Sequence, residues 1–206
     1  MNGVPTGQAG YLAAAMNFLG HLYLSGNDPH TIVGNFMGDH VKGRDLSAHP
    51  PGIQHGLRLH RAIDVATDMH PAHRAGRARL RPYAGRYAGV VMDLFYDHLL
   101  ASDWEEWHPE PLFQFTRRMY DLLNDHRGLM PARSREILHW MEKGDWLGSY
   151  ARMNGLARAL EGLSRRAVQG SPMRGAETVL QDHLAAYRQE FATFLPAMRT
   201  TTRDLL

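Results

Sequence analysis

Apolar residues recur at steps of three and four along nearly the whole chain, and this period restricts the fold more than any other feature of the sequence. The clearest run lies between residues 176 and 200, where the spacing includes Leu180, Leu184, Tyr187, Phe191, Phe194 and Met198. No segment shows the sustained alternation of apolar and polar residues that is typical of half-buried strands. We therefore predict an all-α fold, a single domain of about eight or nine helices.

Prolines, glycines and capping residues divide this pattern into separate helices. We expect Thr31 to cap the second helix and Pro71 to open a basic one. Residues 1–15 carry no charge and begin with a stretch rich in small residues, so we expect a flexible N-terminal extension before a helical domain of residues 16–206. The helices are expected at residues 11–24, 31–42, 53–67, 71–82, 83–102, 111–126, 131–141, 145–162 and 176–200.

The absence of cysteine narrows the chemistry that this chain can support. With no cysteine among 206 residues, a disulfide framework, a thiolate zinc site, an iron–sulfur cluster and a cysteine nucleophile are all excluded. Any metal must be held by His, Asp or Glu, and the chain has 13 His beside 21 acidic residues. These residue types are ligands for Zn, Mn or Fe.

The sequence lacks the signatures of several other classes of protein. No apolar run reaches the roughly 18 residues of a membrane span, and no signal peptide is evident, so we expect a cytoplasmic protein with no membrane partner. There is no P-loop, no G-x-S-x-G elbow and no H-E-x-x-H motif. Aromatic and basic residues do not interleave as they do on nucleic-acid surfaces, so no nucleic-acid partner is expected.

Two helices carry ligand-type residues at a spacing of four, which places them on one helix face. In LHRAIDVATD these residues are His60 and Asp64, with Asp68 one turn further along. An isolated pair of this kind is more often a salt-bridged helix face than a metal site. In GVVMDLFYDHLL they are Asp93 and Asp97, followed by His98, within an otherwise apolar helix. Buried carboxylates are unfavourable unless they are paired or bind a metal, so both interpretations stay open.

The first two helices add further polar residues at the same spacing. Asn17 and His21 share one face, as do Asn35 and Asp39. The glycines around Asn35 allow close backbone approach, which fits simple helix packing as well as a site. Four helices with inward polar residues nevertheless match the way helical bundles build metal centres. We expect the His60–Asp64 and Asp93–Asp97 faces to meet.

The window from Met69 to Met92 is basic, although the net charge of the whole chain is only +2. It contains no acidic residue. One interpretation of this basic window is a solvent-exposed helix face without a specific role. The other interpretation is a docking surface for an acidic macromolecule. The arginines in this window are Arg74, Arg77, Arg79, Arg81 and Arg86.

Five blocks of sequence, in order, resemble the acyl carrier protein phosphodiesterases, also called acyl carrier protein hydrolases. They are MNFLGHLYLS from Met16, VGNFMGDHVKG from Val33, GLRLHRAIDVATD from Gly56, MDLFYDHLLASDW from Met92 and DWLGSYARMNGLARALEGLSRR from Asp145. The resemblance covers residues 16–166. The last forty residues match only in helical character and length.

This resemblance implies that the chain removes the 4'-phosphopantetheine arm from holo-acyl carrier protein and returns the apo form. It implies a divergent relative of the HD-type phosphohydrolases that depends on Mn²⁺, with Mg²⁺ or Fe²⁺ as alternatives. The adjacent His-Asp dipeptide of HD proteins is absent, and the reversed pair Asp97-His98 stands in its place. The HD ligand set therefore cannot be copied position by position.

Only residues inside the matching blocks are carried over as site residues. The implied metal ligands are His21, Asp39, His60, Asp64 and Asp97, with Asp93 and His98 less surely. The implied catalytic residues are Asp39, Asp97 and His98, with His40 as a second candidate for the acid. Arg61 or Lys42 would bind the phosphate oxygens, and Arg77 with Arg81 would bind the carrier protein.

Two other functions remain open on the sequence. One is an HD-like phosphohydrolase that acts on a nucleotide or another small phosphoester. The other is a non-catalytic helical protein that binds an acidic partner, with its His and Asp residues merely satisfied in the core. Metal analysis separates an enzyme from a binding protein, and conversion of holo- to apo-carrier separates the two kinds of enzyme.

Overall fold

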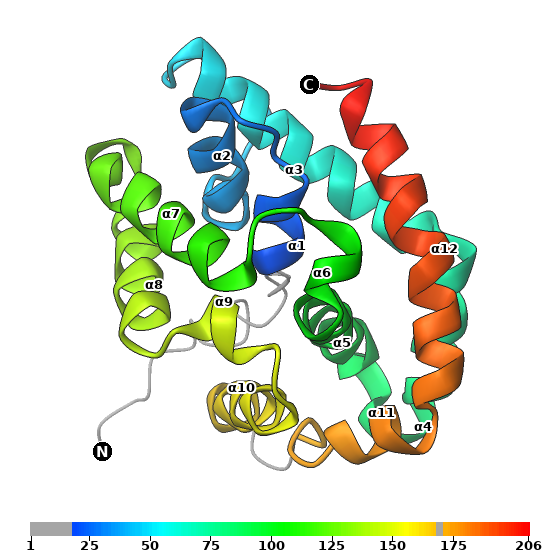
Figure 1. Ribbon diagram of the computed structural model, residues 1–206. Helices are drawn as coiled ribbons and strands as arrows, with labels where there is room; N and C mark the ends of the chain where they lie inside the picture. The colour runs from blue at the N-terminus through cyan, green and yellow to red at the C-terminus, as the bar shows by residue number, and fades with distance from the viewer. Residues whose placement is uncertain (1–17, 168–170) are drawn as a thin grey trace, which may run out of the picture.

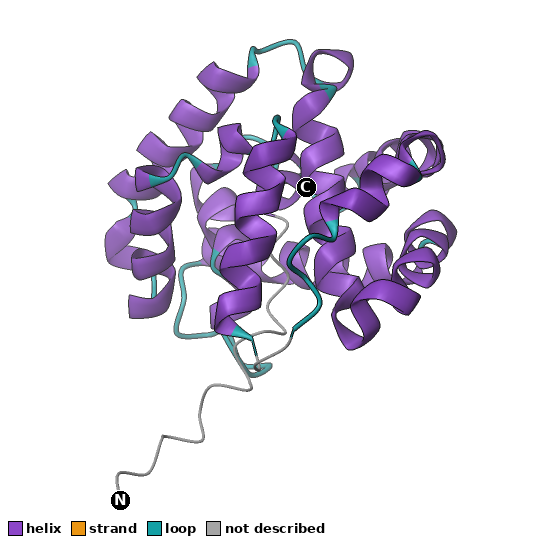
Figure 2. Ribbon diagram, turned by 90° about the horizontal axis from the view of Figure 1, so that it is seen from below, coloured by secondary structure: helices purple, strands orange, loops and turns teal. Residues whose placement is uncertain are grey.

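The structure is a computed structural model that describes residues 18–167 and 171–206. These residues form helices joined by short loops, and no strand occurs among them, which confirms the predicted all-α class (Figures 1 and 2). The α-helices are α1 (Phe18–Tyr23), α2 (Pro29–Phe36), α3 (Pro51–Met69), α4 (Pro71–Ala84), α5 (Ala88–Ser102), α6 (Trp104–Trp107), α7 (Leu112–Asp125), α8 (Ala132–Lys143), α9 (Trp146–Ser149), α10 (Met153–Arg166), α11 (Glu177–Asp182) and α12 (Leu184–Arg203). The short 3₁₀ helices are η2 (Gly38–His40), η3 (Gly85–Tyr87) and η4 (Arg127–Leu129).

The second helix begins and ends earlier than its sequence suggests. Its cap is Asp28 and not Thr31: the Asp28 carboxylate accepts the backbone N–H of Thr31 at 2.8 Å, and Pro29 occupies the first turn. The helix ends at Phe36, and η2 follows it with Asp39 and His40. Asp39 and His40, which the sequence places in the same helix as Asn35, therefore lie in a separate short helix.

Three of the expected helices are interrupted. The helix expected over 83–102 breaks at Gly85, whose φ of 53° cannot continue a right-handed helix. The segment 145–162 divides into α9 and α10, and 176–200 divides into α11 and α12. Periodicity alone does not reveal such breaks, because apolar residues keep their spacing across a tight turn.

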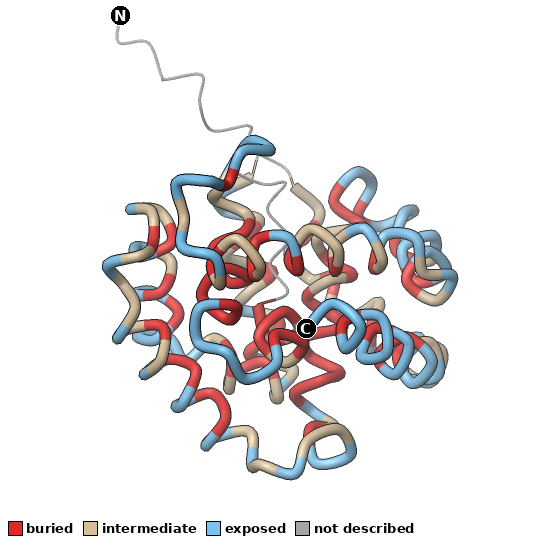
Figure 3. The backbone as a smooth tube through the Cα atoms, turned by 90° about the horizontal axis from the view of Figure 1, so that it is seen from above, coloured by how far each residue is buried: buried red, intermediate tan, exposed pale blue. Residues whose placement is uncertain are grey.

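Helix α5 forms the centre of the core. It packs against α1, α4 and α10, and nearly all of its residues from Val91 to Ala101 are buried. Figure 1 shows α5 nearly end-on, with α7 and α8 on one side and α4 and α12 on the other. The buried segments gather on the inside of the molecule (Figure 3). Polar groups on α5 therefore need partners inside the protein.

The closest helix pair is α2 with α3. Gly34 and Gly56 face each other across this contact, and a Cβ on Gly56 would overlap the carbonyl oxygen of Thr31. This confirms the packing interpretation of the Gly34 position. It also sets α2 close enough for its polar side chains to reach those of α3.

No helix in the described ranges is long and apolar enough to cross a membrane. The extension expected at residues 1–15, the first part of the helix expected from residue 11, and Asn17 lie outside the described residues.

Candidate metal centre

Side chains from α1, η2 and α3 converge at one point. The Nε2 atom of His21 lies 3.2 Å from Asp64 Oδ1, and the Nε2 atom of His60 lies 3.3 Å from Asp64 Oδ2. Asp39 joins from η2, with its Oδ1 3.4 Å from His60 Nε2. One ligand atom from each of His21, His60 and Asp64 can be chosen so that all lie within 4.8 Å of one another, which is close enough to surround one ion.

The side chain of Asn35, in α2, fixes both imidazoles. Its amide nitrogen donates to the carbonyl oxygen of His21 at 3.0 Å and to the hydroxyl of Ser25 at 2.8 Å. Its Oδ1 therefore faces the two rings, 2.7 Å from Nδ1 of His21 and 3.2 Å from Nδ1 of His60. Because a carbonyl oxygen can only accept, both Nδ1 atoms must carry the hydrogen.

In the neutral form of each ring, this hydrogen-bond pattern leaves Nε2 as an acceptor directed at a carboxylate. The Nε2 atom of His21 is buried and has no hydrogen-bond partner within the described part of the chain. Two lone pairs facing the carboxylates of Asp64 and Asp39 repel one another unless a positive charge lies between them. A divalent cation satisfies all four groups at once, so these residues fit a metal ion.

The pKa values in the cluster follow the same electrostatics. Burial lowers the pKa of His21, but the Asp64 carboxylate and Asn35 more than offset this, so the pKa lies above its ordinary value. Burial raises the pKa of Asp64, but the neighbouring His21 outweighs burial and holds it below its ordinary value. Both shifts have the direction expected of a buried histidine beside an ionised carboxylate.

The cluster is closed on one side and open on the other. The side chains of His21 and His60 are 4% and 6% exposed, and their rings stack with centroids 4.3 Å apart. The Asp64 side chain is 38% exposed, compared with 11% for Asp39. A ligand can therefore approach the cluster from the Asp64 side, as catalytic metal sites require.

The structure does not bring Asp97 into this cluster. Its carboxylate oxygens accept the backbone N–H groups of Leu19 and Gly20 at 3.1 Å and 2.8 Å. Asp97 therefore holds the first turn of α1, which carries His21. Burial raises the pKa of Asp97 to about 8, although these two hydrogen bonds oppose that shift.

The two expected helix faces have different neighbours. His60 and Asp64 on α3 contact α1, α2 and η2, whereas Asp97 on α5 contacts the backbone of α1. Asp93 pairs with His73 of α4, with Nε2 and Oδ1 3.3 Å apart. Helix α5 packs chiefly against α4, α1 and α10, and α3 packs chiefly against α2, while Ile63 and Thr67 of α3 share a small cavity with Asp93 and Asp97 of α5.

The two candidate acids lie in different surroundings. His98 is buried, and its Nδ1 donates to the carbonyl oxygen of Tyr150 at 2.7 Å. His40 follows Asp39 in η2 and is half-buried, with its Nδ1 3.1 Å from the hydroxyl oxygen of Ser134. Burial lowers the pKa of both histidines. Only His40 lies beside a residue of the cluster in sequence.

The cations expected at the phosphate differ in what they do. Arg61 donates to the carbonyl oxygens of Val41 and Gly43 at 3.3 Å and 2.7 Å, so it holds the loop that follows η2. Lys42 lies in that loop, is exposed, and contributes to the lowered pKa of Asp64. Lys42 is thus free to bind an anion at the open side, and Arg61 positions its loop.

Asn35 and Gly38 are central to the cluster and were not singled out as site residues from the sequence. The sequence indicates Asn35 only through its spacing of four from Asp39. It indicates Gly38, one of the glycines near Asn35, only as a residue that allows close helix packing. A Cβ on Gly38 would overlap the ring of His60. The signal in the sequence is the segment GNFMGDH, in which a glycine directly precedes both Asn35 and Asp39.

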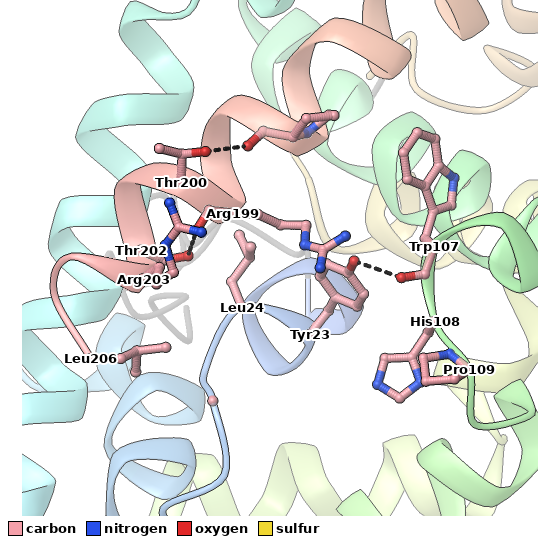
Figure 4. A pocket seen from close by; sticks show the side chains of 12 residues that line it. Tyr23, Leu24, Trp107, His108, Pro109, Arg199, Thr200, Thr202, Arg203 and Leu206 are labelled. Carbon is pink, nitrogen blue, oxygen red and sulfur yellow. Dashed lines mark hydrogen bonds between the residues drawn. The ribbon is translucent and has the colours of Figure 1, made fainter.

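A separate cavity lies away from this cluster. Its volume is about 500 Å³, and it lies between the end of α1, the segment after α6 and the last turns of α12 (Figure 4). None of the four cluster residues lines it.

Comparison with known proteins gives one consistent family. The family model described as acyl carrier protein phosphodiesterase matches residues 16–198. The family match therefore extends beyond residue 166, where the matching sequence blocks end. Beyond that residue the sequence alone indicated only similar helical character and length. No solved structure matches this chain significantly.

Curated relatives carry the same name, acyl carrier protein phosphodiesterase. The relative from Yersinia enterocolitica is 29% identical over 190 residues, which cover 92% of this chain and 98% of that protein. The relative from Enterobacter sp. (strain 638) is 30% identical over 190 residues, with the same coverage. The relative from Escherichia coli O157:H7 is 30% identical over 188 residues, covering 89% of this chain and 95% of that protein.

Proposed function

This chain belongs to the acyl carrier protein phosphodiesterase family, and from that premise we propose that it is a metal-dependent phosphodiesterase acting on holo-acyl carrier protein. The bond cleaved is the phosphodiester between the carrier serine and 4'-phosphopantetheine, and the products are apo-carrier and the released arm. Mn²⁺ is the proposed ion, with Mg²⁺ or Fe²⁺ as alternatives.

One observation carries the metal dependence. Asn35 accepts from Nδ1 of both His21 and His60, so in the neutral imidazoles both Nε2 lone pairs face carboxylates. Ligating histidines typically donate their other ring N–H to an oxygen that sets the ring orientation, and Asn35 supplies that oxygen here. A core that merely satisfied its polar groups would place a donor opposite each carboxylate instead.

The residues of the cluster would bind the metal ion on which hydrolysis depends. A divalent ion, when bound, offsets the charge that develops on the phosphoryl group and activates water near neutral pH. His21, His60, Asp64 and Asp39 would hold that ion.

The residues around the cluster would position the substrate and move the proton. Lys42 would bind the non-bridging oxygens of the diester at the exposed side of Asp64. Arg61 keeps the Lys42 loop in place through Val41 and Gly43. His40 is proposed as the acid that protonates the leaving serine oxygen, in place of the buried His98.

The decisive assay is intact-mass analysis of holo-carrier incubated with the protein and Mn²⁺. We expect a mass loss equal to the phosphopantetheine arm, and no change when the ion is removed by a chelator. A nucleotide or another small phosphoester serves as the competing substrate. Unchanged holo-carrier together with rapid hydrolysis of the small phosphoester would contradict the proposed substrate.

The basic helix α4 is the proposed docking surface for the carrier. Arg77 pairs with Asp68 at 2.7 Å, but both side chains are well exposed, so this pair is weak and can exchange for a carboxylate of the carrier. Asp68 lies one turn beyond Asp64 on α3, next to the exposed apolar side chains of Val65 and Met69. Arg81 is exposed and makes no ion pair with the described residues. Arg79 does not belong to this surface, because both of its terminal nitrogens bind Glu190 of α12.

Arg77→Glu combined with Arg81→Glu should raise the KM for holo-carrier strongly. Acyl carrier proteins are acidic, and with a screening length of about 8 Å at 0.15 M salt only charges near the contact direct docking. The kcat on saturating carrier and the hydrolysis of a small phosphodiester should remain near the wild-type values. Steady-state kinetics at several salt concentrations measures this, and high salt should mimic the variant.

The matched control is Arg165→Glu with Arg166→Glu, which reverses two arginines in the last turn of α10. This pair should leave KM unchanged. If KM instead rises in the α10 variant and not in the α4 variant, the carrier docks near Arg165 and Arg166.

A further inference from the structure

The cavity between α1, α6 and α12 has the composition of a binding site that is separate from the metal centre. Its volume of about 500 Å³ lies within the range of small-molecule sites in proteins. His21 and Tyr23 are two residues apart on α1 and face different partners: His21 faces Asn35 and Asp64, whereas Tyr23 lines the cavity. A molecule in this cavity would therefore contact α1 from outside the metal centre.

The charged side chains that line the cavity are both arginines. Arg199 and Arg203 line it one turn apart on α12, and none of its lining residues is acidic. Within the described ranges neither arginine has a carboxylate partner; the guanidinium of Arg199 lies over the ring of Tyr23, 6.0 Å from its centroid. In Figure 4 the two guanidinium groups lie on either side of Leu24, Arg199 above Tyr23 and Arg203 on the side of Leu206. Unpaired guanidinium groups without an acidic neighbour favour an anionic ligand.

The rest of the lining is apolar and aromatic. Leu24 lies in the middle of the lining, with Leu206 on one side of it and the rings of Tyr23 and Trp107 on the other (Figure 4). The hydroxyl of Tyr23 donates to the carbonyl oxygen of Trp107 at 3.0 Å, which fixes one wall. An inorganic anion alone would leave this apolar surface uncovered, so the lining matches a ligand with both an anionic head and an apolar body.

We propose that this cavity binds a small amphiphilic anion, a carboxylate or phosphate attached to an apolar chain or ring. Arg199 and Arg203 bind the head, and Leu24, Leu206 and Trp107 contact the apolar body. The site requires neither the metal nor the carrier protein, so it is independent of the proposed hydrolysis.

The fluorescent probe 8-anilinonaphthalene-1-sulfonate, which combines an anion with aromatic rings, tests the site by equilibrium titration of the full chain. We expect saturable binding that weakens at least tenfold in Arg199→Gln with Arg203→Gln. The matched control, Arg117→Gln with Arg152→Gln, removes two exposed arginines outside the cavity and should bind as the wild type does. Thr200→Phe places a ring in the cavity from an exposed lining position and should also abolish binding while both arginines remain.

Displacement of the probe identifies the ligand class. Decanoate and decyl phosphate distinguish a carboxylate from a phosphate head, and at least one of them should displace the probe. Decanol lacks the charge and inorganic phosphate lacks the chain, so neither should displace it at the same concentration. Probe binding that survives both the double arginine variant and Thr200→Phe would overturn the proposal, as would equal displacement by decanol.

Discussion

Asp64→Ala is expected to abolish hydrolysis of holo-carrier and to lower bound Mn²⁺, while circular dichroism shows nearly unchanged helicity. Among the described residues, Asp64 is the carboxylate that contacts both imidazoles, through Oδ1 to His21 and Oδ2 to His60. The loss should exceed the roughly 10–100-fold that substitutions of outer partners of a metal ligand typically produce. Alanine favours helix and the position is partly exposed, so the fold should persist.

Asp68→Ala provides the matched control for this experiment. Asp68 lies one turn further along the same helix and is well exposed, and its partner is Arg77 instead of the cluster. Its removal should leave Mn²⁺ binding and hydrolysis of a small phosphodiester unchanged. Full activity and a full complement of metal in Asp64→Ala would refute the assignment of the site.

Gly38→Ala is expected to weaken Mn²⁺ binding and hydrolysis by roughly 10–100-fold, because one methyl group would displace a metal ligand. The added Cβ would overlap the His60 ring. That ring cannot move freely, since it stacks on His21 and its Nδ1 is bonded to Asn35. Overpacking of this kind destabilises a protein by about 1–3 kcal/mol. The Tm should therefore fall by several degrees, on the order of 2–4 °C per kcal/mol for a chain of this length.

Gly162→Ala separates the effect at Gly38 from a general effect of replacing glycine. Gly162 lies within α10, and a Cβ there would meet open space. This variant should keep wild-type metal binding and have an equal or higher Tm, because alanine is favoured over glycine inside a helix by roughly 0.5–1 kcal/mol. Metal titration and thermal unfolding of both variants measure the difference. Wild-type Mn²⁺ affinity in Gly38→Ala would show that His60 does not hold the ion.

Local sequence patterns were enough to determine the helical class and to place one pair of candidate ligands on one helix face. The three- and four-residue period predicted the all-α class, and the spacing of four placed His60 and Asp64 on one face of what became α3. Five matching blocks predicted the family, which the comparisons confirm over residues 16–198. All of these signals act within one helix or one continuous segment, so they are present in the sequence itself.

The partners of each polar residue were decided by the tertiary structure alone. Asp97 and Asp64 look alike in sequence, as carboxylates in helices at a spacing of four from another polar group. Packing gives Asp97 the backbone of α1 and gives Asp64 the two histidines. Arg79 likewise finds Glu190, 111 positions away, while Arg81, two residues along, stays exposed.

Which ring nitrogen of His21 and of His60 carries the hydrogen is also decided by the tertiary structure and not by the sequence. Sequence supplied His21, Asn35 and His60 on three separate helices, with no indication that one amide oxygen would serve both rings. The close approach of α2 to α3 brings that oxygen to both Nδ1 atoms and leaves both Nε2 atoms facing carboxylates. Helix periodicity is a property of neighbours along the chain, whereas a metal centre depends on which helix faces meet, and only the packed core determines that.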